Sequence, residues 1–344
     1  MSLFISIIIP CRNEENFISK CLDSILENDY PKDRIEILVS DGMSEDGTRE
    51  IVKRYSEKYL FIKLLDNHQK VTPIAMNIGI KHSVGEIIVI VSAHSILDKE
   101  FLKHSVEYLK TTEADAVGGI LIALPGNNSI LAQSIAVAIS HPFGVGNAYF
   151  RIGSKEPKYV DTVPFGCYRK EVFNRVGFFD EELIRNQDDE FNFRLIKNGG
   201  KILLIPDIIS YYSVRDSLSK LWNMYFQYGY FKPLVVKKIG GVCTWRQLVP
   251  MAFISSLIIS GICSIFFRLC GISFIAISFF YILVNSMFSF SICIKKGLKH
   301  FISLFMSFAT LHFAYGFGYL KGIWNFIILK KSQRRAIKDV PLTR

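Results

Sequence analysis

The chain has 344 residues, carries a formal net charge of +10 and is half hydrophobic, with a mean hydropathy of +0.26. Because a single core rarely grows far beyond about 250 residues, two parts are expected. Apolar residues concentrate in the last third, which indicates a soluble head and a membrane tail. With a membrane tail, the positive charge is expected to attract anionic lipid or a phosphorylated substrate rather than nucleic acid. The seven cysteines lie singly, without C-x-x-C pairs, which argues against a disulfide framework or a zinc site.

The first two thirds of the chain alternate between strand and helix patterns. Strands are predicted at 3–9, 35–39, 60–65, 86–91, 115–123, 160–164 and 201–206, and helices at 17–26, around 51–55, at 72–84 and at 187–198. This alternation predicts an α/β head at residues 1–215, with a mostly parallel sheet, helices on both faces and a ligand site at the carboxyl ends of the strands. The N-terminus lacks the basic start and long apolar run of a signal peptide, so the head is expected in the cytoplasm.

The last third is expected to contact the membrane. Residues 216–245 are aromatic and basic, which suits an amphipathic interfacial helix, and packing of this helix against the head is the alternative. Membrane helices are expected within 246–329, and a basic cytoplasmic tail follows at 330–344. The uncharged stretches lie at about 249–267, 269–294 and 301–320. Three full spans would place the basic tail outside the cell, so we expect two spans in the inner membrane, with the third stretch spanning or re-entrant.

Two polar loops follow the first two strands, at residues 10–15 and 40–48. Both loops resemble the paired donor-binding motifs of family 2 glycosyltransferases with a GT-A fold, and the resemblance covers about residues 4–215. It implies a divalent metal and a nucleotide-sugar donor, which we expect to be a UDP-sugar. It also implies that Asp41 contacts the base or ribose, although an Asx-turn would equally favour an aspartate before Gly42. The other residues that it places in the nucleotide pocket are Pro10, Arg12, Asn13 and Glu14.

A third motif, Ser92-Ala93-His94, follows the strand predicted at 86–91. The family carries an Asp-x-Asp type signature here that holds metal and donor phosphates, and the similar succinoglycan-type glucosyltransferases have Asp-Ala-His. The resemblance therefore implies that Ser92 and Ala93 contact the donor and that His94 binds Mg²⁺ or Mn²⁺ through its imidazole. Ser92 lacks a charge, so weaker metal binding is expected than at an Asp-x-Asp site. A polar loop residue without a ligand is the alternative for His94.

Acceptor chemistry is predicted from two later stretches. Residues 160–170 resemble the same subset and imply that the Phe165-Gly166 turn borders the acceptor. Inverting transfer needs a carboxylate that accepts the proton of the acceptor hydroxyl, and the resemblance aligns Asp188 with this base. The family usually has glutamate before this aspartate, so Gln187 is a departure that removes a neighbouring charge. Alternatively, the acidic residues at 188–190 only favour the N-terminus of a helix.

Together these motifs predict an inverting glycosyltransferase that acts on a lipid-linked or other glycan acceptor in surface or exported polysaccharide synthesis. Processive members carry Arg and Trp where this chain has Tyr230 and Phe231, after Gln227, so addition of one sugar per encounter is expected. Ser92 and Gln187 leave open a catalytically silent partner of a glycan-assembly complex. A nucleotide-regulated transporter would need more polar residues within the spans than the sequence offers.

Overall fold

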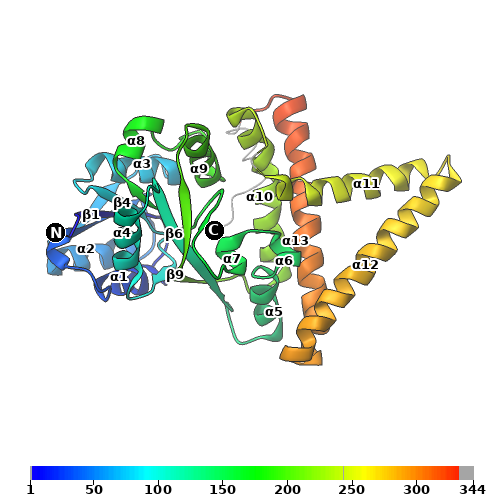
Figure 1. Ribbon diagram of the computed structural model, residues 1–344, viewed down its shortest axis with the longest axis horizontal. Coiled ribbons are helices and arrows are strands. Elements are labelled where there is room, and N and C mark those ends of the chain that lie inside the picture. The colour runs from blue at the N-terminus through cyan, green and yellow to red at the C-terminus, as the bar shows by residue number, and fades with distance from the viewer. Residues whose placement is uncertain (1, 243, 333–344) are drawn as a thin grey trace. The chain divides into compact units, whose positions relative to one another are not determined.

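The computed structural model describes residues 2–242 and 244–332. The chain divides into two compact units; Figure 1 colours it by residue number. We call the first the head unit; it comprises the residues up to Ile122 and Tyr149–Ser213. The second, the tail unit, comprises Ala123–Ala148 and the residues from Val214 onward. The insertion Ala123–Ala148 therefore belongs with the C-terminal part, a grouping that the sequence analysis did not anticipate.

The head unit is built on one sheet, to which the described residues contribute nine strands in the order β3-β2-β1-β4-β8-β6-β9-β5, with β7 paired to β9. The pairs β1–β2, β1–β4 and β2–β3 are parallel, whereas β4–β8, β6–β8, β5–β9 and β7–β9 are antiparallel. The strand bounds are β1 (Ile5–Cys11), β2 (Ile35–Asp41), β3 (Ile62–Asp66), β4 (Ile87–Ile90), β5 (Ser95–Leu97), β6 (Ala116–Leu124), β7 (Lys158–Tyr159), β8 (Cys167–Arg169) and β9 (Ile202–Ser213).

Helices cover both faces of this sheet, as expected for an α/β fold. Successive residues of β1 point to opposite faces, so Ile7 belongs to one buried cluster and Ile8 to the other. The cluster around Ile7 includes residues of α1 (Ile18–Leu26), α2 (Thr48–Lys58) and α4 (Phe101–Thr111). The cluster around Ile8 includes residues of α3 (Thr72–His82), α8 (Glu171–Val176) and α9 (Gln187–Lys197). Short helical segments complete the unit at η1 (Lys32–Arg34) and α7 (Tyr149–Ile152).

Two details of the sheet differ from the sequence prediction. The sheet is mixed rather than mostly parallel, because the regular strand and helix alternation that produces parallel crossovers stops after β4. The strand predicted at 160–164 is not present; β7 and β8 lie on either side of it. Pro164 falls in this stretch and has no N–H to donate to a strand ladder, which opposes regular pairing there.

The tail unit consists of helices. Its bounds are α5 (Ile130–Ala138), α6 (Pro142–Val145), α10 (Leu218–Ile239), η2 (Trp245–Gln247), α11 (Val249–Cys263), α12 (Arg268–Lys296), η3 (Leu298–His300), α13 (Phe301–Gly322) and the π-helical turn η4 (Ile323–Ile328). Within this unit, α10 and α13 run side by side (Figure 1). A Cβ atom at Gly229 would lie 2.1 Å from the carbonyl oxygen of Tyr315, so glycine is required for this close approach. The predicted helix at 216–245 thus exists as α10, and it packs on α13.

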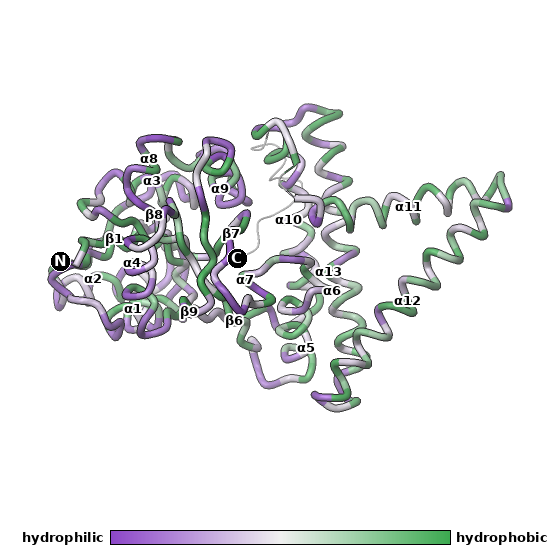
Figure 2. The backbone as a smooth tube through the Cα atoms, in the orientation of Figure 1, coloured by the Kyte–Doolittle hydropathy of each residue, from purple (hydrophilic) through white to green (hydrophobic). Residues whose placement is uncertain are grey.

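Among the described residues, three helical segments are long and apolar enough to cross a membrane: Trp245–Cys263, Arg268–Lys296 and Leu298–Ile328. Figure 2 shows that α11 and α12 are largely hydrophobic. Their most apolar windows are only 17% and 6% buried within the protein, whereas that of Leu298–Ile328 is 50% buried. The basic tail predicted at 330–344 lies outside the described residues from position 333 onward.

Candidate active site

The predicted site begins where neighbouring strands end. Cys11 at the end of β1 is in register with Asp41 at the end of β2, and Ile8 is in register with Ile90 at the end of β4. Since these three strands are parallel, the loops that follow them leave the same edge of the sheet. The structure therefore brings the stretches 10–15, 41–48 and 92–94 to one edge, as the sequence analysis expected of a ligand site.

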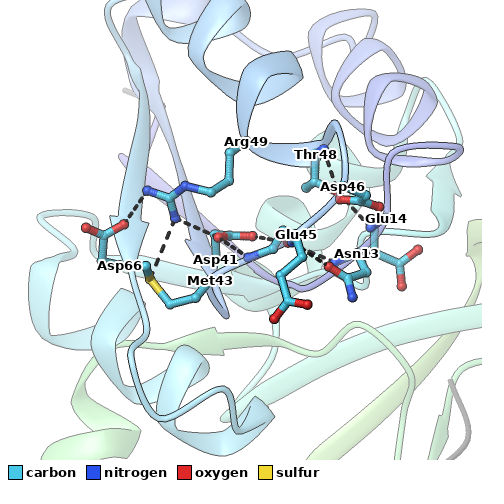
Figure 3. A network of polar contacts seen from close by, with 10 residues as sticks. Asn13, Glu14, Asp41, Met43, Glu45, Asp46, Thr48, Arg49 and Asp66 are labelled. Atoms are coloured by element: carbon cyan, nitrogen blue, oxygen red, sulfur yellow. Dashed lines mark hydrogen bonds and ion pairs between the residues drawn. The ribbon is translucent and has the colours of Figure 1, made fainter.

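The first two loops are hydrogen-bonded to each other (Figure 3). The Asn13 side-chain oxygen accepts from the Glu45 backbone at 2.9 Å, while the Asn13 backbone N–H donates to Ser44 Oγ at 2.8 Å. The Glu14 backbone N–H donates to Thr48 Oγ1 at 2.8 Å. Asn13 has a positive φ of 53°, which asparagine tolerates better than most residues. These contacts fix the loops in one conformation.

Asp41 lies at the centre of this network and has no exposed surface. Its carboxylate accepts hydrogen bonds from the Ser44 backbone at 2.9 Å and from Ser44 Oγ at 2.5 Å. Arg49 of α2 donates to Asp41 and to Asp66, both at 2.7 Å (Figure 3). The hydrogen bonds to Asp66 and Asp41 raise the pKa of Arg49, so its positive charge is secure. The capping role of Asp41 is thus visible, and its contact with a base or ribose stays a prediction.

His94 faces Glu14 across the edge of the sheet. His94 Nδ1 lies 3.3 Å from Glu14 Oε1, and Ser92 Oγ lies 3.2 Å from the same nitrogen. The Glu14 side chain is 8% exposed and the His94 side chain 38% exposed, so the pair opens toward solvent on the histidine side. Ala93, which separates Ser92 from His94 in the chain, is buried in the core. Arg12 is more peripheral and lies 3.9 Å from Glu45.

Glu14 and His94 are the candidate ligands for a divalent cation. In the described part of the chain, no cluster of three or more His, Cys, Asp or Glu side chains is placed to hold a metal. Glu14 and His94 provide a carboxylate and an imidazole within hydrogen-bonding distance of each other. Mg²⁺ is commonly held by one or two carboxylates together with substrate phosphates. The residues therefore fit a cation that binds together with a phosphate ligand better than one bound by protein alone.

The antiparallel strand β8 starts beside the end of β4. The Ile90 backbone N–H donates to the carbonyl of Gly166 at 3.2 Å, which places the Phe165-Gly166 turn at the same edge as Ser92. Tyr168 of β8 donates its hydroxyl to Asn192 of α9 at 2.9 Å, so α9 is held against this strand. Burial and the nearby charge of Asp188 raise the pKa of Tyr168. Asp188 stands in the first turn of α9, the helix that this hydrogen bond holds against β8.

The three acidic residues at the start of α9 differ in environment. Glu190 is buried and forms an ion pair with Arg194 one turn later, with 2.7 Å between Glu190 Oε1 and Arg194 Nε. Glu190 therefore stabilises α9 itself, so one of the acidic residues at 188–190 has a structural role. Asp188 is exposed and Asp189 is half-buried. The role of Asp188 as the base stays a prediction.

The comparison with known proteins decides the family. The model of "Glycosyl transferase family 2" matches residues 6–177, which include the polar loops at 10–15 and 40–48 and the Ser92-Ala93-His94 motif. The chain belongs to glycosyl transferase family 2. A dolichyl N-acetyl-alpha-D-glucosaminyl phosphate 3-beta-D-2,3-diacetamido-2,3-dideoxy-beta-D-glucuronosyltransferase of Methanococcus voltae is 32% identical over 93% of this chain and 97% of that protein. The succinoglycan biosynthesis protein ExoA of Rhizobium meliloti is 27% identical over 72% of this chain and 74% of its own length.

Solved structures agree with the fold of this family 2 enzyme. A mannosyltransferase from Pyrobaculum calidifontis, PcManGT, aligns with a TM-score of 0.62 at 18% identity, covering 94% of this chain and 88% of its own. The S. aureus TarS fragment 1–349 aligns with a TM-score of 0.51 at 17% identity, covering 94% and 91%. The predicted GT-A fold is thereby confirmed. The family and its relatives also establish that the chain is a glycosyltransferase, which removes the silent-partner alternative.

Several residues of this glycosyltransferase site were missed from sequence. Ser44 and Arg49 hold Asp41, and Asp66 holds the other end of the Arg49 guanidinium, yet only Ser44 lies in a recognised motif. Asn67 follows β3 and is 1% exposed; its side-chain oxygen has no hydrogen-bond partner among the described residues, whereas its amide donates to the Val71 carbonyl. The end of β3, which neighbours β2, was the available signal, because its polar residues must reach the same edge.

Proposed function

We propose that this glycosyltransferase moves a sugar from a nucleoside-diphosphate-sugar donor to a hydroxyl of a lipid-linked glycan acceptor, with inversion at the anomeric carbon. We expect the donor to be a UDP-sugar. The convergence of the three polar loops at one sheet edge carries the donor half of this proposal. The acceptor half is supported by the relatives. The Methanococcus voltae protein is named for a dolichyl-linked sugar phosphate, and the Rhizobium meliloti protein for succinoglycan biosynthesis.

The nucleoside is assigned to the edge formed by β1, β2 and β3. Pro10, Arg12 and Asn13 line this edge, and Asp41 is held there by Arg49. The buried side-chain oxygen of Asn67, which has no hydrogen-bond partner within residues 2–242 and 244–332, would accept a hydrogen bond from a donor group of the base or ribose. These loops would bind a ligand with little ordering cost, because they are already fixed by their own hydrogen bonds.

The diphosphate is assigned to the edge formed by Glu14, Ser92 and His94. Glu14 and His94 would hold Mg²⁺ or Mn²⁺ together with oxygens of the donor phosphates. When bound, the cation supplies positive charge that offsets the charge developing on the departing diphosphate. Ser92 is placed to hydrogen-bond His94 and so to orient its ring.

Asp188 is assigned as the base. Its carboxylate accepts the proton of the acceptor hydroxyl while that oxygen forms a bond to the anomeric carbon, and the bond between this carbon and the diphosphate oxygen breaks on the opposite face. The nucleoside diphosphate then leaves. The assignment is supported by the position of α9, which is hydrogen-bonded to β8. The start of β8 lies beside the end of β4.

Addition of a single sugar per encounter is supported by the positions that replace the processive motif. Tyr230 and Phe231 of α10 have no exposed surface and pack against Phe326 within the tail unit. The Tyr230 hydroxyl accepts a hydrogen bond from the Asn325 side chain at 2.6 Å. Side chains committed to helix packing in this way are not available to guide a growing chain.

The membrane arrangement that we propose has α11 and α12 as two spans of the inner membrane, a cytoplasmic head unit and α13 at the membrane surface. Support comes from burial, since the window in Leu298–Ile328 is half covered by protein whereas those of the other two segments are not. A hairpin of two spans returns the chain to the side on which it entered. The basic residues from Lys330 onward then lie on the cytoplasmic side, as Lys and Arg prefer.

The test is a transfer assay with the full chain in nanodiscs. A panel of nucleotide-sugars is supplied with Mg²⁺ or Mn²⁺ and a polyprenyl-phosphate-linked sugar, and both nucleoside diphosphate and lipid-linked product are measured. The proposal expects stoichiometric release and product formation with one donor, with product one sugar longer and of inverted configuration. Products extended by many sugars, or transfer only to water-soluble acceptors, would contradict the corresponding part of the proposal.

A further inference from the structure

The tail unit contains an apolar groove between α11 and α12. Its volume is about 440 Å³, within the size range of ligand sites. Figure 1 shows that the two helices diverge from their shared turn and reach α13 separately. The lining side chains are Phe253 of α11 and Ala276, Ile277, Phe280, Tyr281 and Val284 of α12.

One wall of this groove is fixed by polar contacts. The Tyr281 hydroxyl lies 3.1 Å from His312 Nδ1, and His312 Nε2 lies 2.7 Å from the carbonyl oxygen of Phe143. A carbonyl only accepts, so Nε2 carries the hydrogen and Nδ1 accepts from the tyrosine. Both ring nitrogens are then satisfied in the neutral form. Phe143 belongs to the insertion Ala123–Ala148, and its ring stacks on Phe288 of α12 with 4.7 Å between ring centroids.

The groove requires a hydrocarbon occupant. It is formed by the two segments that are least buried by protein and most apolar, so the surrounding medium is lipid. Basic residues, Lys295, Lys296 and Lys299, lie at the end of α12 and just beyond. Val284 lies about 16 Å along the helix from Lys295, at 1.5 Å per residue. A chain in the groove can therefore have its phosphate at the level of these lysines, where anionic groups are favoured.

We propose that the groove between α11 and α12 binds the polyprenyl chain of the lipid-linked acceptor, with Tyr281 and His312 positioning its wall. This rests on the proposed function, which supplies a polyprenyl carrier as the substrate. Branched, unsaturated isoprene units suit an irregular wall of aromatic and branched side chains. An acyl chain of an ordinary phospholipid is the competing occupant, and the experiment below separates the two.

The experiment compares two neighbouring positions of α12. Ala276→Trp fills the groove, whereas Ile275→Trp places the same side chain on the outer face, where Ile275 is 67% exposed. Val284→Trp is a second groove-filling variant in case the first fails to fold, and gel filtration together with donor binding reports folding. Each protein is placed in phospholipid nanodiscs and irradiated with a photoreactive polyprenyl phosphate or a photoreactive phospholipid.

The expected result is specific labelling of the segment 276–284 by the polyprenyl probe. Labelling should fall about tenfold in Ala276→Trp, a loss of roughly 1.4 kcal/mol in binding, and stay unchanged in Ile275→Trp. The KM for the polyprenyl-linked acceptor should rise by a similar factor, with acceptor-independent donor hydrolysis unchanged. Equal labelling of both variants, or equal labelling by the phospholipid probe, overturns the inference. Labelling without any sugar transfer would contradict the proposed function but support lipid binding in the groove. Sugar transfer without labelling would support the proposed function and contradict binding in the groove.

Discussion

The donor-side loops, residues 10–15 and 40–48, and the start of α9 differ in how firmly their acidic side chains are held. In the loops, Asp41 has no exposed surface and its carboxylate is held by Ser44 and Arg49. At the start of α9, Asp188 is exposed, and its neighbour Glu190 is buried and forms an ion pair with Arg194. A pocket that binds one donor can be fixed in advance, whereas a base must remain accessible to an incoming hydroxyl. Substitutions in the two regions should therefore fail in different ways: loss of chemistry in α9 and loss of stability or donor affinity in the loops.

The largest effect is expected at Asp188. Asp188→Asn keeps the shape of the side chain but cannot accept the acceptor proton, so kcat should fall by roughly 10²–10⁴. Donor affinity and thermal stability should stay at the wild-type level because the residue is exposed. Initial rates with saturating acceptor check this, with Asp189→Asn as the matched control. If Asp189→Asn abolishes transfer and Asp188→Asn does not, the base is assigned to the wrong aspartate.

The next effect is expected at Arg49. Arg49→Met leaves the fully buried Asp41 carboxylate without its guanidinium partner, and breaking such a pair costs about 3 kcal/mol or more. Arg54→Met on the same helix removes an exposed arginine and should change stability by less than about 0.5 kcal/mol. Thermal unfolding of both variants in the same detergent measures the difference. A stable Arg49→Met protein would show that Ser44 alone holds Asp41.

A smaller effect is expected at His94. His94→Ala removes the imidazole that faces Glu14, and donor affinity in the presence of Mn²⁺ should fall about tenfold, or 1.4 kcal/mol. Without metal, the variant and the wild type should bind the donor more similarly, because the loops that hold the nucleoside are unchanged. Calorimetric titration with and without metal checks this, with the exposed His82→Ala as control. If His94→Ala and the wild type show the same metal dependence, His94 is an ordinary loop residue and not a metal ligand.

The comparison also shows which features the sequence could predict. The β-branched runs predicted that the loops after β1 and β2 share one edge of the sheet, because local pattern and strand direction determine this arrangement. Arg49 and Asp66 escaped notice because the register of β2 and β3 brings Asp41 and Asp66 together beside α2, and this arrangement leaves no local sequence pattern. The insertion Ala123–Ala148 was assigned to the head because its packing partners are distant; His312 is 169 residues from Phe143. The strand predicted at 160–164 is absent, which shows that the β-branched residues Val160, Thr162 and Val163 do not outweigh a proline.

The smallest effect is expected in acid. The hydrogen bond from Arg49 lowers the pKa of Asp66, which otherwise titrates near 3.9. A carboxyl with a depressed pKa stabilises the folded state fully above its unfolded pKa, and this stabilisation is lost as the pH falls through the folded value. The wild type should therefore lose stability more steeply below about pH 4 than Arg49→Met, whereas Arg54→Met should follow the wild type. Melting temperatures recorded across this range decide the point. Parallel curves for the wild type and Arg49→Met would mean that the Arg49 and Asp66 pair adds nothing to the stability of the donor-side loops.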